Sequence, residues 1–178
     1  MIKGNKTKIR PLRKEDFPNI FRWVNDPGIM QFWYGRDKQR SMEWIKKHFT
    51  PAIEGKTDWT YWVIETNNKP IGYMCNTVEK DDDGEFIGKV EIDILIGEKE
   101  MQEKGYGPNA LKAMINYAFK TQKAERVFLV PRLTNSRAIH VYQKVGFKKE
   151  GTLRHYEKFE GRWVDNLMMS VLKDEYKK

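Results

Sequence analysis

Residues 100–114 read EMQEKGYGPNALKAM, with two glycines and a proline directly ahead of a patterned helix. Apolar residues recur at helical spacing from Ala110 to Phe119, which predicts an amphipathic helix after Gly107. Before the stretch, the alternating run KVEIDILIG, residues 89–97, predicts a buried central strand. The glycines therefore lie at a turn from a strand into a helix, and the remaining question is whether they serve as a hinge or as a site.

The glycines of this turn predict an anion-binding loop. Small residues before a helix expose several N–H groups at the positive end of its dipole, which suits a pyrophosphate. Gly105 and Gly107 permit positive φ and the close approach of a bulky ligand, and Pro108 suits the first helical turn because its missing N–H is not needed there. Two glycines and a proline also fit a plain helix cap. The stretch has neither GxxxxGK[ST] nor the third glycine of a dinucleotide fingerprint.

The rest of the chain predicts an α+β fold. Helices are expected where Asp16 and Ser41 can cap a first turn, and a third from Asn135 or Ser136 to a C-terminal cap at Gly146. Runs of β-branched and aromatic residues, bounded by turn residues such as NNKP, predict the strands. These strands cover residues 7–12, 58–66, 71–79, 89–97, 127–130, 147–154 and 163–172.

Composition indicates one domain over residues 1–178. Hydrophobic residues make up 39% and aromatic residues 13%, which argues against disorder. No apolar run reaches the roughly 20 residues that span a bilayer, and the N-terminus lacks the apolar segment of a signal peptide. We therefore expect a cytoplasmic protein without a membrane partner. Cys75 lies in an apolar run, so a buried neutral thiol is expected there.

The net charge of +8 is unevenly distributed. Residues 79–93 carry −5, which leaves +13 on the remainder. The acidic segment suits a cationic ligand, and a solvated hairpin loop is the alternative for Asp81 to Asp83. No nucleic-acid-binding motif accompanies the positive charge, so no nucleic-acid partner is expected.

A second pattern lies downstream, in NSRAIHVYQKVGF, residues 135–147. Asn135 and Tyr142 lie seven positions apart on one helical face. Here the chain resembles the GNAT superfamily of acetyl-CoA-dependent N-acetyltransferases. The match is carried by QEKGYG, which fits the [RQ]xxGx[GA] pyrophosphate loop, by EIDILIG before it and by the helix after it. The resemblance covers roughly residues 8–172 and implies a central, twisted, mixed and mostly antiparallel sheet of about seven strands flanked by helices.

The resemblance implies a set of residues that bind acetyl-CoA. The strand ending in DILIG would offer backbone groups to the pantetheine arm, and the backbone of the glycine loop would hold the pyrophosphate. Lys104, Arg137 and Lys144 would add charge near the nucleotide, although each also fits a solvated surface position. The donor residues expected are Leu95, Ile96, Gln102, Lys104, Gly105, Tyr106, Gly107, Asn135 and Arg137.

The implied reaction is direct transfer from the thioester to an amine, in which positioning of the two reactants supplies much of the rate. Tyr142 is the expected general acid at the leaving thiolate, and a packed core tyrosine is its alternative. Asp93 is the expected base, directly or through water, and an acceptor-binding residue; an outward-facing strand residue is the alternative. Trp33, Tyr34 and Glu79 are further candidates for acceptor binding.

Within the superfamily the N-terminal half and IDILIGE look like the aminoglycoside 6'-N-acetyltransferases, which implies an amino-sugar acceptor. One position departs from that branch, because Val130 stands where an acidic residue is often found. The C-terminal segment, residues 150–176, looks more like the ribosomal-protein and polyamine acetyltransferase branches. Acetylation of protein N-termini or of polyamines is therefore the alternative, and a non-enzymatic acyl-CoA sensor is a third. A homodimer is compatible with the resemblance, and the three histidines show no metal-ligand spacing, so no metal is expected.

Overall fold

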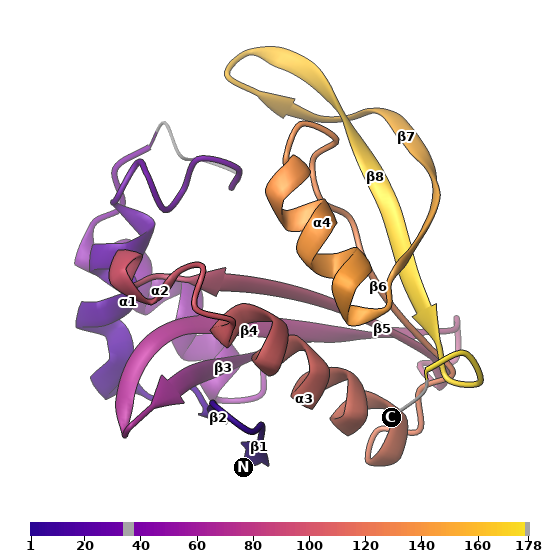
Figure 1. The fold of residues 1–178 in the computed structure, drawn as a ribbon. Coiled ribbons are helices and arrows are strands. Elements are labelled where there is room, and N and C mark those ends of the chain that lie inside the picture. Colours follow the sequence, from indigo (N-terminus) through magenta and orange to yellow (C-terminus); the bar gives the residue numbers. More distant parts are fainter. Residues whose placement is uncertain (34–37, 177–178) are drawn as a thin grey trace. The chain divides into compact units, whose positions relative to one another are not determined.

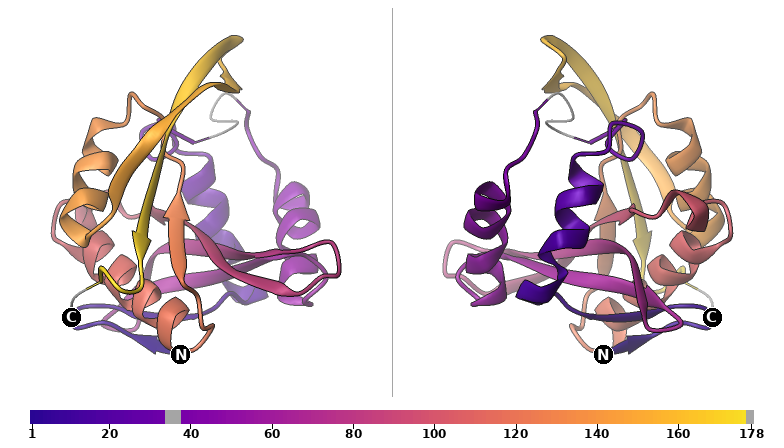
Figure 2. Two further views of the ribbon diagram at one scale, coloured as in Figure 1. Left: turned by 90° about the vertical axis from the view of Figure 1, so that its right-hand side faces the viewer. Right: turned by 90° about the vertical axis from the view of Figure 1, so that its left-hand side faces the viewer.

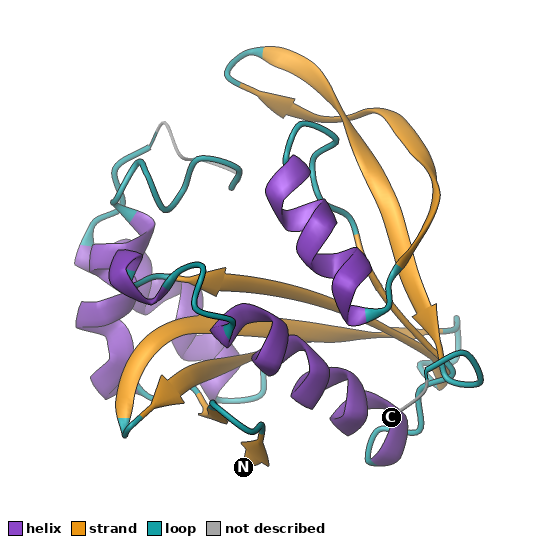
Figure 3. Ribbon diagram, viewed as in Figure 1, coloured by secondary structure: helices purple, strands orange, loops and turns teal. Residues whose placement is uncertain are grey.

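The computed structural model describes residues 1–33 and 38–176. This part of the chain contains both strands and helices (Figure 1, Figure 3). The elements are β1 (Ile2–Lys3), β2 (Lys8–Pro11), the 3-10 helix η1 (Lys14–Asp16), α1 (Phe17–Val24), α2 (Met42–Ile53), β3 (Trp59–Thr66), β4 (Lys69–Lys80), β5 (Phe86–Ile96), the 3-10 helix η2 (Lys99–Met101), α3 (Tyr106–Lys120), β6 (Arg126–Leu129), α4 (Ser136–Val145), β7 (Lys148–Phe159) and β8 (Arg162–Leu172).

Hydrogen bonds join the strands of the described chain into one sheet, in the order β1-β2-β3-β4-β5-β6-β8-β7. The pairing of β5 with β6 is parallel, whereas β1 with β2, β2 with β3, β3 with β4, β6 with β8 and β7 with β8 are antiparallel. The expected α+β fold with a mixed, mostly antiparallel sheet is confirmed. β1 adds a short edge strand beyond those expected from the sequence.

The chain forms two compact units. The first consists of Met1–Thr77 and Asp93–Met114, and the second of Val78–Ile92 and Ile115–Lys178. β5 and α3 each contribute residues to both units. The expectation of a single domain therefore stays a prediction.

In the first unit, α1 and α2 lie on the same side of β3 and β4, as both views of Figure 2 show. Their apolar faces bury Ile20 and Ile45 completely, together with Val63 of β3 and Leu95 of β5. Adjacent residues of a strand point to opposite faces, so Ile96 points away from α1 and α2. This core fixes the end of β5.

Of the two helix caps expected at Ser41 and Asp16, the structure confirms the first and not the second. Ser41 caps α2 as expected, because its hydroxyl accepts a hydrogen bond from the N–H of Trp44 at 3.1 Å. Asp16 precedes α1 but makes no side-chain cap to it. Its carboxylate instead accepts the N–H of Arg13 at 2.9 Å and forms a bidentate ion pair with Arg10 at 2.7 and 2.8 Å. Asp16 therefore stabilises the 3-10 turn that leads into α1.

Within the acidic segment, residues 81–85 form an exposed turn that joins β4 to β5. Asp81 organises this turn, because its carboxylate accepts the N–H groups of Asp83 at 3.1 Å and of Glu85 at 2.8 Å. The structure thus favours the solvated-loop interpretation for residues 81–83. Glu79, before the turn, pairs with Lys89 across the hairpin at 3.1 Å.

In the second unit, β7 and β8 form a long antiparallel hairpin with irregular register between Lys149 and Gly151 and again between Leu153 and Glu157. β8 pairs in turn with β6. The helix expected after residue 135 is confirmed as α4, and it ends at Gly146 with φ of 116°.

Candidate functional site

The loop between β5 and α3, residues 97–105, is held by side chains along its length. Near its start, Glu98 accepts a hydrogen bond at 2.9 Å from the indole N–H of Trp23 on α1. Further along, the side-chain amide of Gln102 donates to the backbone carbonyl of Ile96 at 2.9 Å. The loop therefore enters α3 along a fixed path. The carbonyl of Ile96, one of the backbone groups expected to face the donor, is bonded to Gln102.

The glycines at the end of this loop have different roles. Gly105 has φ of 82°, and its carbonyl accepts the helical N–H of Asn109 at 3.2 Å. Gly107 does not adopt the positive φ that glycine permits, because α3 already begins at Tyr106 and Gly107 lies inside its first turn. Pro108 lies in the first turn, as expected.

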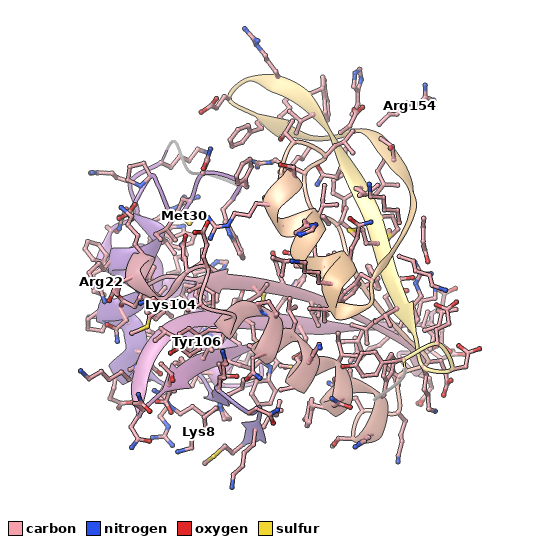
Figure 4. All side chains as sticks on the ribbon, in the orientation of Figure 1. Lys8, Arg22, Met30, Lys104, Tyr106 and Arg154 are labelled. Atoms are coloured by element: carbon pink, nitrogen blue, oxygen red, sulfur yellow. The ribbon has the colours of Figure 1, made fainter. Side chains whose placement is uncertain are left out.

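The first turn of α3 contains the backbone N–H groups on which the expected anion-binding site depends. A helix leaves its first N–H groups without intrahelical partners, and here these include the N–H groups of Tyr106 and Gly107. They lie at the positive end of the dipole of a 15-residue helix. Figure 4 shows Lys104 on the loop just before this turn and Tyr106 at its start. A phosphate group is the ligand that this geometry favours.

Aromatic rings from α2, β3 and β4 and from the segment between α1 and α2 form a cluster in the first unit, here called the aromatic wall (Trp33, Trp44, His48, Phe49, Tyr61 and Tyr73). The ring of Tyr73 lies 5.9 Å from Trp33 and 6.3 Å from Tyr61, and Tyr61 lies 4.9 Å from Phe49. Trp33 was predicted from the sequence, whereas the other rings were not. Tyr34, predicted beside Trp33, lies outside the described residues.

His48 lies at the outer end of the aromatic wall. Its ring stacks on Trp44 at 4.7 Å, and its Nε2 lies 3.3 Å from the hydroxyl of Tyr61. Although the residue as a whole is exposed, the partial burial of the ring lowers the pKa of His48, and the positive charge of Arg40 lowers it further. A neutral imidazole is therefore favoured beside the Tyr61 hydroxyl.

The Asp93 carboxylate acts electrostatically on two phenols of the aromatic wall. Burial is the largest cause that raises the pKa of Tyr61 and of Tyr73, and Cys75 and then Asp93 raise both further. Asp93 itself is exposed, near the end of β5, and its carboxylate accepts the N–H of Ile94 at 3.0 Å. The two phenols therefore stay protonated beside an accessible negative charge. Such an arrangement suits an ammonium group carried on an apolar or hydroxylated stem.

The predicted residues of α4 lie in the second unit. Asn135 is the N-cap of α4, and its side-chain oxygen accepts the N–H of Ala138 at 3.1 Å, so it has a structural role. Arg137 is exposed in the first turn. Tyr142 is buried, with 8% of its surface exposed, and its ring lies 6.0 Å from that of Phe147.

Glu79, predicted to bind the acceptor, also belongs to the second unit. Glu79 forms an ion pair with Lys89, and its negative charge also affects the pKa of Glu91 on β5. Burial raises the pKa of Glu91, and the nearby charge of Glu79 raises it further. Its role in acceptor binding stays a prediction.

Comparison with known proteins identifies the family. A model described as the acetyltransferase (GNAT) domain matches residues 6–148, which include the glycine loop, the aromatic wall and α4. The chain belongs to the GNAT family. As a GNAT enzyme it transfers an acetyl group from acetyl-CoA to an amine.

The names of two relatives of this GNAT enzyme mention two different kinds of acceptor. It is 25% identical to the spermidine N(1)-acetyltransferase of Escherichia coli K12, over 99% of this chain and 91% of that protein. It is 24% identical to the aminoglycoside N(6')-acetyltransferase type 1 of Klebsiella pneumoniae, over 84% of this chain and 78% of that protein.

Solved structures agree on the GNAT fold. The spermidine N-acetyltransferase of Vibrio cholerae, in complex with CoA and spermine, has a TM-score of 0.82 at 22% identity, covering 96% of this chain and 97% of that one. The aminoglycoside acetyltransferase AAC(6')-Ib in complex with coenzyme A has a TM-score of 0.79 at 21% identity, covering 95% and 96%.

One network of this GNAT enzyme was not predicted from the sequence. Arg132, with 3% of its surface exposed, forms a bidentate ion pair with Glu157 at 2.8 and 3.1 Å, and its guanidinium lies 3.5 Å from the ring centre of Phe159. Asn166 of β8 donates to the same Glu157 and to the carbonyl of Val130, each at 3.1 Å. The network ties the hairpin to the segment that leads into α4. In the sequence, a single arginine after a proline does not indicate such a network.

The described residues of the GNAT enzyme contain neither a metal-binding cluster nor a membrane-spanning helix. Within residues 1–33 and 38–176, no three His, Cys, Asp or Glu side chains are arranged to hold a metal ion. Over the same residues, no helix is long and apolar enough to cross a membrane.

Gly105→Val should weaken CoA binding by the GNAT enzyme by about tenfold or more. A β-branched residue at φ of 82° is strained, and the strain distorts the turn that aims the N–H groups of α3. Isothermal titration with CoA measures the effect. Gly55→Val is the matched control, because Gly55 has φ of 70° but lies after α2, away from the loop. Equal CoA affinities of the two variants would contradict the assignment of the loop.

Proposed function

We propose that this GNAT enzyme acetylates a primary amine of a small polycationic molecule, and that an aminoglycoside 6'-amine is its acceptor. The observation that carries the proposal is the exposed Asp93 carboxylate, two residues before Leu95 on β5 and therefore on the sheet face where Leu95 packs in one cluster with Tyr73. A carboxylate attracts an ammonium group, and aromatic faces bind cations and pack against sugar rings.

The hydroxyl of Tyr61 adds a reason to favour an amino sugar. Burial and nearby groups keep this phenol protonated, and His48 lies within 3.3 Å of its oxygen. A phenol so placed can donate to or accept from the hydroxyl groups that surround each amine of an aminoglycoside. A hydrocarbon amine offers no partner for it.

A linear polyamine is the second candidate. The rings of the aromatic wall can also pack against the aliphatic stems between the amines of such a molecule. The relative with the widest coverage among those described above is a spermidine acetyltransferase. The two candidates share the ammonium group at Asp93 and differ in what the aromatic wall contacts.

In the proposed reaction the free amine attacks the thioester carbonyl directly. Asp93 first accepts a proton from the ammonium group, directly or through water, which leaves the nitrogen lone pair available. The N–C bond then forms as the C–S bond breaks. Tyr142 donates a proton or a hydrogen bond to the departing thiolate, and the amide nitrogen loses its remaining extra proton to solvent.

In the same proposal, the donor is held mainly by backbone groups. Backbone groups at the end of β5 bind the pantetheine arm, and N–H groups of the glycine loop bind the pyrophosphate. Side chains along the loop and at the start of α4 add charge or polar contacts. The residues proposed are Leu95, Ile96, Gln102, Lys104, Gly105, Tyr106, Gly107, Asn135 and Arg137, with Trp33 and Glu79 proposed for the acceptor.

The proposal is tested by identifying the acetylated product. The enzyme is incubated with acetyl-CoA and an equimolar mixture of kanamycin, spermidine and a basic peptide with a free N-terminus, and products are analysed by mass spectrometry and NMR. We expect one acetyl group, on the 6'-nitrogen of kanamycin. Preferential acetylation of spermidine would favour the second candidate, and acetylation of the peptide would overturn both small-molecule assignments.

A further inference from the structure

The segment between β1 and β2 lies against the start of α3 in the first unit. Residues 4–7 form a tight turn, closed by a hydrogen bond of 2.8 Å from the N–H of Gly4 to the carbonyl of Thr7. This turn is distant from the glycine loop in sequence, and no motif marks it. Its position is set by Asn109 of α3, and the hydroxyl of Thr66 on β3 also donates to the carbonyl of Lys6 at 3.1 Å.

The side-chain oxygen of Asn109 fastens this turn. It accepts the backbone N–H groups of Lys6 and Thr7, each at 3.0 Å, and the hydroxyl of Thr7 at 2.8 Å. Thr7 is buried, with 5% of its surface exposed. A Cβ at Gly4 would overlap the same oxygen and would lie 2.9 Å from the hydroxyl of Thr7, so the close approach requires glycine. The turn is thus fixed to the first turn of α3.

The fixed turn places the ammonium group of Lys6 at the glycine loop. Its Nζ lies 3.5 Å from the backbone carbonyl of Lys104, and it is 3.7 Å from the point where a Cβ of Gly105 would lie. Within the described part of the chain, no carboxylate lies within ion-pair distance of this Nζ. A positive charge therefore stands beside the N–H groups of α3 without an anionic side chain to neutralise it.

We propose that Lys6 is a donor-binding residue, whose ammonium group pairs with the pyrophosphate of acetyl-CoA alongside the N–H groups of Tyr106 and Gly107. The inference rests on the assignment of the glycine loop as the donor site. A helix N-terminus contributes only partial charges, so a full positive charge beside it strengthens the binding of an anion. The pairing would make this enzyme discriminate between CoA thioesters and thioesters without the nucleotide.

Lys6→Gln tests the proposal through CoA affinity, measured by isothermal titration without any acceptor. We expect the Kd of CoA to rise by about five- to tenfold, in the range of one charge-assisted hydrogen bond at an exposed position. Lys6 binds Asn109 through its backbone N–H, so the substitution leaves the turn intact. Lys8→Gln is the matched control, since it removes an equal charge two residues away, on β2 (Lys8 is labelled in Figure 4).

Three ligands separate the phosphates of CoA. The penalty of Lys6→Gln should be the same for CoA and for dephospho-CoA, which lacks the 3'-phosphate, and should vanish for pantetheine, which lacks the pyrophosphate. Lys6→Arg should restore most of the affinity. Equal penalties for Lys6→Gln and Lys8→Gln, or a penalty that disappears with dephospho-CoA, would overturn the proposal. The assay contains no acceptor, so a failed acceptor assignment would leave its result unaffected.

Discussion

Tyr142→Phe is expected to lower kcat by about 100-fold, the size of effect typical of a lost general acid. The Kd of CoA should change by less than about twofold, because phenylalanine keeps the ring that packs on Phe147. The substitution removes only the hydroxyl proposed to reach the leaving thiolate. Single-turnover kinetics with acetyl-CoA, combined with titration of CoA, separate the chemical step from donor binding.

Tyr176→Phe is the control for this result. Tyr176 also packs against an aromatic ring of the second unit, that of Phe119 at 5.6 Å, and burial raises the pKa of its phenol. Its substitution should leave kcat within about twofold, the range of a conservative exchange. A loss of CoA binding that matches the loss of kcat in Tyr142→Phe would show that Tyr142 is a packing residue, which was the alternative considered from the sequence.

Asp93→Asn is expected to lower kcat/KM for a cationic acceptor by about 100-fold at pH 7. The variant loses both the charge that attracts the ammonium group and the group that accepts its proton. The fold should persist, because the exchange is nearly isosteric and Asp93 is exposed. The deficit should shrink as the pH rises towards about 10, the ordinary pKa of an alkyl ammonium group, since free amine then becomes abundant.

A matched charge change elsewhere on the chain checks whether the effect of Asp93→Asn is local. Asp82→Asn, in the exposed turn after β4, is the control with an equal change in net charge. If Asp93→Asn and Asp82→Asn gave the same kcat/KM, Asp93 would be an ordinary outward-facing strand residue.

Local sequence patterns predicted several elements of the fold well. The cap at Ser41, the strand before the glycine loop and the Gly146 end of α4 are properties of a few neighbouring residues, and all were confirmed. The start of α3 was predicted less accurately. The helix begins at Tyr106 and Gly107, ahead of the apolar periodicity, which starts only at Ala110.

The missed features depend on residues far apart in sequence. Asn109 joins Lys6 across 103 positions, and Arg132 meets Glu157 across 25. No periodicity or turn signal encodes such a pairing, because it exists only after the strands have found their order in the sheet. The aromatic wall was foreseen only at Trp33 for the same reason: Tyr61 and Tyr73 read as ordinary strand residues until their strands pair.

The central claim is that this GNAT enzyme acts on a small polycationic amine, and kcat/KM measured by thiol release from acetyl-CoA tests it most directly. The value for kanamycin should exceed that for a basic peptide with a free N-terminus by at least about 100-fold, and Asp93→Asn should remove most of the difference. A value for the peptide equal to or above that for both kanamycin and spermidine would contradict the claim.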